Sequence, residues 1–161
     1  MHPNVDAVIG AAAERGLTIE PREFPEGTRT ADDAARAIGV EAGQIVKSLV
    51  FTVSGAVVMA LVSGANRLDE RLLARAVDGV GGDAARVERA DADLVKTATG
   101  FPIGGVPPFG HPAVLRTFVD EDLLAYDVVW AAAGTPRHVF PIAPDDLARI
   151  TAGAIAKLAR A

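Results

Sequence analysis

The chain of 161 residues contains no cysteine. Disulfide bonds, thiolate-ligated metal sites and cysteine nucleophiles are therefore excluded together. Long hydrophobic runs are also missing, because the longest ones, residues 56–62 and 128–133, have only the length of a strand. A membrane-spanning helix needs about 20 apolar residues. The sequence therefore predicts no membrane partner.

A surplus of positive charge is lacking as well. The formal net charge is −5, which argues against a nucleic-acid-binding protein that works through a broad basic surface. A local basic patch remains open, formed by Arg67, Arg71, Arg75, Arg86 and Arg89. The first six residues lack the basic start and apolar core of a signal peptide. Together with the missing cysteine, this predicts a cytoplasmic protein.

The common motifs of nucleophilic and cofactor chemistry are absent. There is no Gly-x-Ser-x-Gly elbow, so acyl transfer through a serine nucleophile has little support. The glycine-rich segment 78–82 lacks the Gly-Lys-Ser/Thr ending of a phosphate-binding loop and is interpreted as a turn. The three histidines and the scattered carboxylates do not have the spacing of metal ligands. We therefore expect no metal and no cofactor.

Hydrophobic periodicity predicts one α+β domain over residues 1–161. Most strands are connected by hairpins and not by βαβ units, so we expect a mixed sheet flanked by helices. Asn66 is predicted to cap the third helix. Helices are expected at 3–15, 30–38, 66–77, 91–97 and from 144. Strands are expected at 17–24, 44–53, 56–63, 86–88, 113–119, 128–133 and 137–142.

Lys47 falls in the clearest strand of the chain, residues 44–53. With a period of two, its side chain shares a face with Ile45, Leu49, Phe51 and Val53. A buried ammonium is costly unless it reaches water or meets an anion or dipole. Two interpretations follow: a lysine that extends to solvent, or an ammonium at the mouth of an apolar pocket, ready for a carbonyl or phosphate.

Residues 99–111 read Thr-Gly-Phe-Pro-Ile-Gly-Gly-Val-Pro-Pro-Phe-Gly-His. The glycines and prolines exclude a regular helix or central strand, and the segment is too apolar for a flexible linker. We interpret it as an ordered loop whose main-chain N–H groups line a site, with Phe101 and Phe109 as walls. The alternative is a purely structural connection. His111 either hydrogen-bonds within the loop or contacts substrate, whereas His138 is expected to be structural.

Lys47, this loop and the turn Ala133-Gly134-Thr135 together outline an apolar pocket with main-chain donors and one cation. Such a pocket can polarise an ester or amide carbonyl without a protein nucleophile. It can equally bind a ligand without any reaction.

Four segments, taken in order, resemble a known family. They are Val46-Lys47-Ser48-Leu49, Thr99-Gly100-Phe101, the stretch from Gly104 to Gly110, and Ala132-Ala133-Gly134 leading to Ala143-Pro144-Asp145-Asp146-Leu147. From about Ile9 to Ile150 the chain resembles the YbaK family, also called the prolyl-tRNA synthetase-associated or editing domain. Each segment alone is a weak signal, whereas four in the same order are specific.

The resemblance implies a barrel-like sheet and a free-standing aminoacyl-tRNA deacylase, which hydrolyses the ester of a mischarged tRNA, typically a small amino acid on tRNA for proline. It implies a substrate-assisted mechanism in which the terminal ribose hydroxyl or the substrate side chain helps the attack. Lys47 would be the catalytic residue, holding the aminoacyl-adenosine end. The implied substrate-binding residues are Thr99, Gly100, Phe101, Gly104, Gly105, Pro107, Pro108, His111, Gly134 and Thr135.

Two departures leave the edited amino acid open. Members that act on cysteinyl-tRNA commonly carry serine where this chain has Pro107, so a hydroxyl and a main-chain N–H are missing. His111 lies one residue beyond the histidine of the related Gly-x-x-x-Pro-x-His pattern. An aminoacyl-tRNA synthetase is a further expected partner. The rival hypothesis is a non-catalytic module that binds an aminoacyl or nucleotide ligand, or a synthetase.

Overall fold

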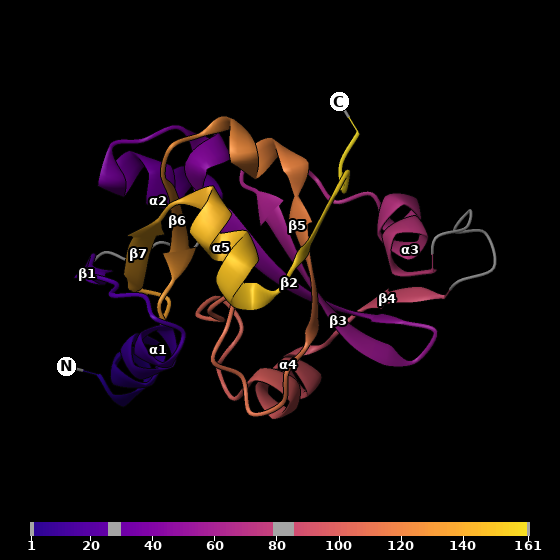
Figure 1. The fold of residues 1–161 in the computed structure, drawn as a ribbon, viewed down its shortest axis with the longest axis horizontal. Coiled ribbons are helices and arrows are strands. Elements are labelled where there is room, and N and C mark those ends of the chain that lie inside the picture. Colours follow the sequence, from indigo (N-terminus) through magenta and orange to yellow (C-terminus); the bar gives the residue numbers. More distant parts are fainter. Residues whose placement is uncertain (1, 26–29, 79–85, 161) are drawn as a thin grey trace.

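The computed structural model describes residues 2–25, 30–78 and 86–160 (Figure 1). The α-helices are α1 (Pro3–Glu14), α2 (Ala31–Ile38), α3 (Glu70–Asp78), α4 (Ala92–Thr99) and α5 (Pro144–Thr151), and the 3₁₀ turns are η1 (Ala42–Gln44) and η2 (Glu121–Ala125). The strands are β1 (Arg22–Glu23), β2 (Val46–Val53), β3 (Ala56–Ser63), β4 (Val87–Arg89), β5 (Arg116–Asp120), β6 (Val129–Ala132), β7 (His138–Ile142) and β8 (Ala154–Ala156).

The strands form two sheets, a five-stranded one in the order β4-β2-β3-β5-β8 and a three-stranded one in the order β1-β7-β6. β2 and β3 pair antiparallel along their whole length, whereas β5 pairs parallel with both β3 and β8. An isolated parallel bridge from Ile45 to Trp130 links the sheets. The α+β class is confirmed. A barrel is not, because the described strands form two open sheets.

Two element predictions differ most from the structure, while β5 begins three residues later than expected and β8 was not predicted. The helix expected from Asn66 begins at Glu70, because the Asp69 carboxylate caps it by accepting the main-chain N–H of Arg71 at 2.9 Å. The strand expected at 17–24 is reduced to Arg22–Glu23, directly after Pro21, which cannot donate to a strand partner. The turn predicted at 78–82 lies outside the described residues except for Asp78.

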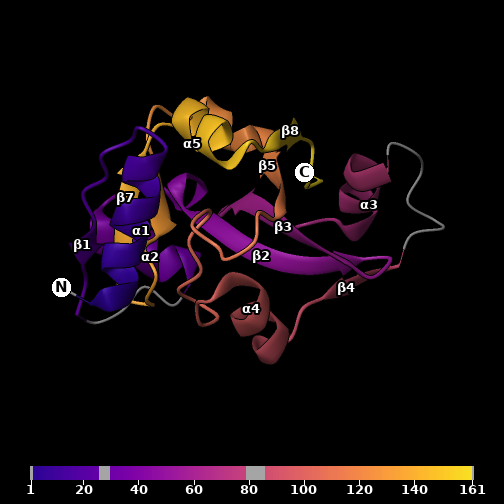
Figure 2. The same cartoon turned by 60° about the horizontal axis from the view of Figure 1, so that its bottom comes forward.

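Both faces of the β2–β3 hairpin are buried. On one face Val46, Val50 and Met59 join a core that also takes in Val8 of α1 and Phe140 of β7. On the other face, β2 and β3 pack under Leu73 of α3. The strand and tail residues of this second cluster are Phe51, Val53, Val58, Phe118 and Leu158. Figure 2 shows α1 against the three-stranded sheet and α3 at the opposite end of the molecule. No helix among the described residues is long and apolar enough to cross a bilayer.

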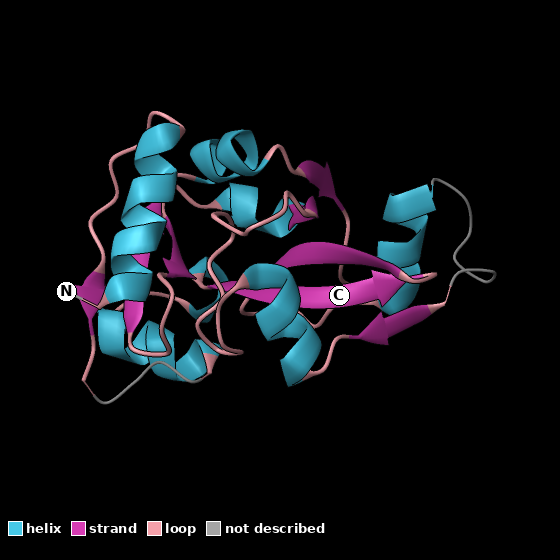
Figure 3. Cartoon of the chain, turned by 90° about the horizontal axis from the view of Figure 1, so that it is seen from below, coloured by secondary structure: helices cyan, strands magenta, loops and turns pink. Residues whose placement is uncertain are grey.

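The outer edge of β2 is covered along only part of its length. β4 pairs with Phe51–Val53, and the Ala90 N–H donates to the Val50 carbonyl at 3.0 Å. Figure 3 shows β4 beside only one end of the long hairpin. Alternate residues of an antiparallel strand direct their main-chain groups to the same edge, so Val46 and Ser48 direct theirs the same way as Val50. Beyond the bridge from Ile45 to Trp130, no described strand pairs with this edge over 47–49.

Candidate active site

A cavity of about 410 Å³ lies at the uncovered end of β2. Its wall is formed by the first turn of α2, residues 45–49 around the start of β2, parts of β6 and β7, and Ile103, Gly104 and Val106 of the glycine-proline loop, together with Gly64 and Arg89. Residues of both faces of β2 contribute to the wall. The strand therefore meets the cavity with its edge, where the main-chain N–H and C=O groups of Ser48 lie.

Lys47 lines this cavity and is half-buried. Its Nζ donates a hydrogen bond to the main-chain carbonyl of Asn66. The Asn66 side chain is fixed in turn, because its Nδ2 donates to the carboxylates of Asp120 at 2.9 Å and Asp122 at 2.7 Å. Asp120 is 1% exposed and also accepts the Ser63 N–H at 3.0 Å. The Lys47 ammonium is thus held by a buried polar network at the end of β3.

Burial lowers the pKa of Lys47 below its ordinary value, 10.5. The buried Asp120 carboxylate opposes this shift by favouring the ammonium, while the positive charges of Arg89 and Arg67 add to it. The result is an ammonium that is partly withdrawn from water and surrounded by charges of both signs. Such a group interacts with a developing negative charge more strongly than a fully hydrated lysine does.

Ser48, the neighbour of Lys47, carries a buried hydroxyl that lacks a hydrogen-bond partner among the described residues. Buried hydroxyls are usually hydrogen-bonded, because leaving one unpaired costs about 1–3 kcal/mol. Ser48 also lines the cavity. The Ser48 hydroxyl is therefore a buried polar group of the wall that is still able to form a hydrogen bond, because no described residue of the protein bonds to it.

The glycine-proline loop approaches the cavity through Ile103, Gly104 and Val106. Gly104 has a φ of +87°, a left-handed conformation that other residues adopt only with strain. Gly105 lies against the main chain of Thr135, where an added Cβ would come within 2.7 Å of the Thr135 Cα. The close contact between Gly105 and the turn at Thr135 therefore fixes how far the loop stands from the cavity.

The aromatic side chains of the loop point inward. Phe101 and Phe109 are 5% and 3% exposed and belong to the main core. The Phe109 ring meets the Phe140 ring edge-on, with centroids 5.8 Å apart. These two residues therefore do not line this cavity. They anchor the loop from behind, because burying an aromatic ring in the core is more favourable than leaving it at an open cavity.

Of the predicted site residues, Lys47 and Gly104 line the cavity, while the other nine lie outside its wall. Several of those nine shape the loop. Thr99 Oγ1 accepts the Phe101 N–H at 3.1 Å, and Gly100 ends α4 with a φ of +82°. Pro107 and Pro108 are buried. Gly134 accepts a hydrogen bond from the Asn4 side chain at 3.0 Å, which attaches the turn to α1.

His111 lies within the loop and away from the cavity wall. Its Nε2 donates to the Pro107 carbonyl over 2.8 Å. Burial lowers its pKa below 6.5, partly offset by the Pro107 carbonyl, and the charge of Arg15 lowers it further. A neutral ring that donates to a carbonyl holds the loop together. His138 likewise bonds within the turn, with Nδ1 2.6 Å from Thr135 Oγ1.

Sequence reasoning missed several residues of the wall, namely Ser48 as a wall residue, Arg89, Trp130 and the first turn of α2. Period-two alternation places Ser48 opposite Lys47, but it does not show that the strand edge is open. The pairing of Arg89 with Phe51, and the bridge of Ile45 to Trp130, join segments far apart in the chain. Among the described residues, no group of three or more His, Asp or Glu side chains could hold a metal ion.

Known proteins share this architecture. A crystal structure described as a candidate trans-editing enzyme for prolyl-tRNA synthetase superposes with a TM-score of 0.91 at 43% identity, covering 100% of this chain and 99% of that one. An Enterococcus faecalis protein named as a candidate Cys-tRNA(Pro)/Cys-tRNA(Cys) deacylase, EbsC, is 28% identical over 137 residues, 84% of this chain and 80% of its own length.

Proline–tRNA ligases contain a similar segment. The ligase of Maridesulfovibrio salexigens is 36% identical over 106 residues, which is 66% of this chain and 17% of the ligase. The chain thus spans about a fifth or less of the length of the ligases that it matches. The family model for the aminoacyl-tRNA editing domain matches residues 25–150. With its fold, its cavity and these similarities together, the chain belongs to the aminoacyl-tRNA editing domain family.

Proposed function

We propose that the cavity beside Lys47 takes the aminoacylated end of a mischarged tRNA and hydrolyses the ester that joins amino acid and ribose. One observation carries the proposal: the Lys47 ammonium is fixed by Asn66 at a cavity bordered by an unpaired strand edge. The family membership agrees with this reaction. Residues 1–161 would act as one free-standing editing unit in the cytoplasm.

The reaction needs a nucleophile, a site for the oxyanion and a proton for the leaving group. Water attacks the ester carbonyl carbon, the bond from that carbon to the ribose oxygen breaks, and the ribose oxygen takes up a proton. Within the described residues, the cavity wall holds Ser48 but no histidine that could act as its base. The free hydroxyl of the terminal ribose is therefore assigned the task of orienting the water, as the family resemblance implies.

Lys47 would stabilise the negative charge that develops on the carbonyl oxygen. A fixed cation in a partly dehydrated site needs little reorganisation when that charge appears. The main-chain N–H and C=O of Ser48, on the open edge of β2, can pair with the polar groups of the amino acid as a neighbouring strand would. The glycine-proline loop would close the other side of the aminoacyl group through Gly104.

The similarity to segments of proline–tRNA ligases favours tRNA for proline as the substrate, charged with a small amino acid. The same similarity makes a prolyl-tRNA synthetase the first partner to test. A site bordered by apolar side chains separates amino acids by only about 1–3 kcal/mol per methylene. The identity of the amino acid therefore has to come from measurement.

The deciding experiment measures deacylation of alanyl-, cysteinyl- and seryl-tRNA for proline, with wild type and Lys47→Ala side by side. We expect hydrolysis of at least one substrate, and a fall of about 10²-fold or more in the variant, as for the loss of an oxyanion donor. The unfolding transition should be nearly unchanged. Equal rates in both proteins would remove Lys47 from the mechanism. No hydrolysis by folded wild type would favour the binding module, to be tested with aminoacyl-adenosine analogues.

A further inference from the structure

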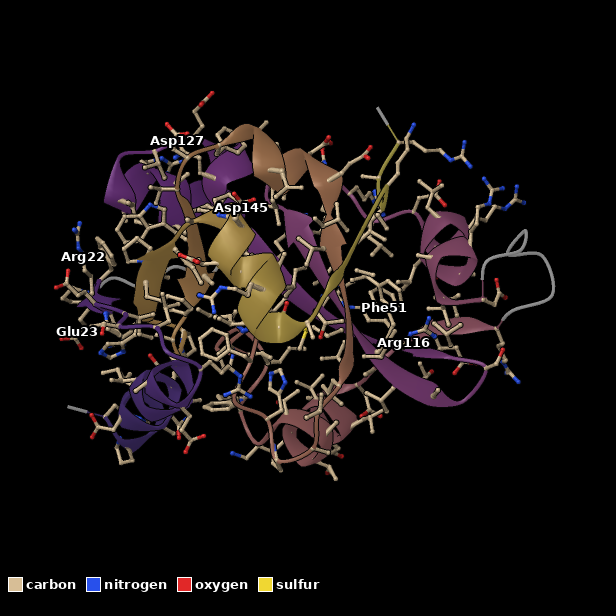
Figure 4. The ribbon with its side chains drawn as sticks, viewed as in Figure 1. Arg22, Glu23, Phe51, Arg116, Asp127 and Asp145 are labelled. Atoms are coloured by element: carbon tan, nitrogen blue, oxygen red, sulfur yellow. The ribbon has the colours of Figure 1, made fainter. Side chains whose placement is uncertain are left out.

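Cationic side chains gather on one side of the five-stranded sheet, the side covered by α3. Strand alternation places Lys47 on the face of Phe51, and Arg89 pairs directly with Phe51. The Arg116 guanidinium lies over the Phe118 ring, 5.1 Å from its centroid, on the same face. In Figure 4, Arg116 and Phe51 both lie below α3. We call this surface the α3 side.

The helix and its flanks add further arginines to the α3 side. Arg71 and Arg75 are exposed and lie one turn apart on α3, so they share one side of the helix. Arg67, Arg71 and Arg160 line a shallow hollow of about 650 Å³. The Arg160 guanidinium pairs there with Asp69, which leaves Glu70 as the other carboxylate of the hollow.

The α3 side is continuous with the cavity. Arg89 lines the cavity wall, and Arg67 follows three residues after Gly64, another wall residue. The charges of Arg89 and Arg67 lower the pKa of Lys47, with smaller effects than those of burial and of Asp120. Both guanidinium groups therefore lie within electrostatic reach of that ammonium. A chain of cations therefore leads from the cavity towards α3.

Elsewhere the surface is dominated by acids, as the net charge of −5 requires. The first turns of α2, η2 and α5 carry Asp32 and Asp33, Glu121 and Asp122, and Asp145 and Asp146. In Figure 4, Asp127 and Asp145 lie well away from Arg116. A polyanion is repelled by these acidic first turns, which favours its approach from the α3 side.

We propose that the α3 side binds the phosphate backbone of the tRNA acceptor stem while the aminoacylated end occupies the cavity. Guanidinium groups suit this task, because their planar array of donors matches two phosphate oxygens at once. The inference rests on the proposed function. It also explains how an acidic protein can bind RNA: the contact is confined to one side, where cations outnumber acids.

The test compares two double variants with equal charge change. Arg71→Gln/Arg75→Gln alters the α3 side. Arg36→Gln/Arg149→Gln alters exposed arginines that are ion-paired with Asp33 and Asp146 away from it. Exposed ion pairs contribute little to stability, so this variant should fold as wild type does. For each variant we measure kcat/KM for hydrolysis of charged tRNA at a series of salt concentrations. We measure kcat/KM also for an aminoacyl-adenosine ester, which has no acceptor stem. A third measurement is the affinity for uncharged tRNA.

We expect Arg71→Gln/Arg75→Gln to lower kcat/KM on charged tRNA about tenfold relative to the short ester. In a plot of log kcat/KM against log salt concentration, the slope for this variant should become less steep by about one for each phosphate that is no longer bound. The control pair should behave as wild type. Equal behaviour of both pairs on tRNA, with hydrolysis intact, would overturn the α3 side and leave the proposed function standing.

If wild type hydrolyses nothing, the proposed function fails and binding of uncharged tRNA decides about the surface. Salt-sensitive binding that is weakened only by Arg71→Gln/Arg75→Gln would support the α3 side as an RNA surface. Absence of binding, or equal weakening by both pairs, would overturn it.

Discussion

The two halves of β2 have the same alternation of side chains but different surroundings. Phe51–Val53 pairs with β3 on one edge and β4 on the other, and Phe51 and Val53 are buried under α3. Among the described strands, residues 47–49 pair with β3 alone, and they border the cavity with their other edge. One half is a central strand that builds the core. The other is an edge strand, and the chemistry is assigned to it.

The difference comes from the length of β4, which covers three residues of an eight-residue strand. An uncovered edge normally invites pairing with another chain. Here it is enclosed by α2, β6 and the glycine-proline loop, so a small group can reach it and a whole strand cannot. The site therefore lies where the pairing of β2 with β4 stops.

The largest effect should come from Phe51→Ala, in the covered half of β2. Removing a buried phenylalanine costs about 3–5 kcal/mol in the free energy of unfolding, measurable by urea denaturation. The rate of hydrolysis per folded molecule should stay near that of wild type. Lys47→Ala should show the opposite pattern, with a nearly unchanged free energy of unfolding and a large loss of hydrolysis. A Phe51→Ala protein that unfolds like wild type, or that is folded and inactive, would break the division between the two halves.

A smaller effect is expected from Asp120→Asn, which removes the negative charge that favours the Lys47 ammonium. Because activity assigned to the ammonium is lost as pH rises through the pKa of Lys47, and the variant lowers that pKa further, the alkaline fall in rate should move to lower pH. The measurement is a pH–rate profile corrected for spontaneous ester hydrolysis and for folded fraction.

Asp122→Asn is the matched control for this profile. Its carboxylate accepts from the same Asn66 amide, but it is exposed and is not among the charges that shift the pKa of Lys47. A shift of equal size in both variants would mean that the position of Asn66, and not the charge of Asp120, sets the profile.

Ser48→Ala should cause no loss of stability. Its buried hydroxyl makes no hydrogen bond within the described residues, so its removal should leave the free energy of unfolding unchanged or raise it by up to about 1–3 kcal/mol. Hydrolysis should nevertheless slow severalfold if the hydroxyl bonds to the substrate. Thr52→Ala, on the same face but beyond the cavity wall, provides the comparison. Equal rates in wild type, Ser48→Ala and Thr52→Ala would mean that the Ser48 hydroxyl takes no part in hydrolysis and that only its main-chain groups can do so.

Local patterns are sufficient to predict much of the fold. The hairpin of β2 and β3, the capped helix α2 and the helix α5 that begins with proline all lie within a few residues of their predicted positions. Alternation also places Lys47 on the face of Phe51. These features depend on residues that are close in sequence, where propensity and periodicity act directly.

The wall of the cavity cannot be predicted in the same way. The sequence around Asn66 predicts a helix cap, but its amide meets a carboxylate 54 residues further along the chain. Phe101 and Phe109 have the composition of a pocket wall, but burial in the core is more favourable for them. Trp130 reaches the cavity through its bridge to Ile45, and the first turn of α2 reaches it by packing against Trp130 and Val139.

The hydrogen bond between Lys47 and Asn66 has a consequence for how a ligand would be held. An ammonium has three N–H donors, and the Asn66 carbonyl takes one of them. Two N–H donors remain for substrate oxygen atoms, so Lys47 can bind a substrate without losing its hydrogen bond to Asn66. The side-chain entropy of about 2 kcal/mol that a free lysine would lose on binding is already lost in large part when the protein folds.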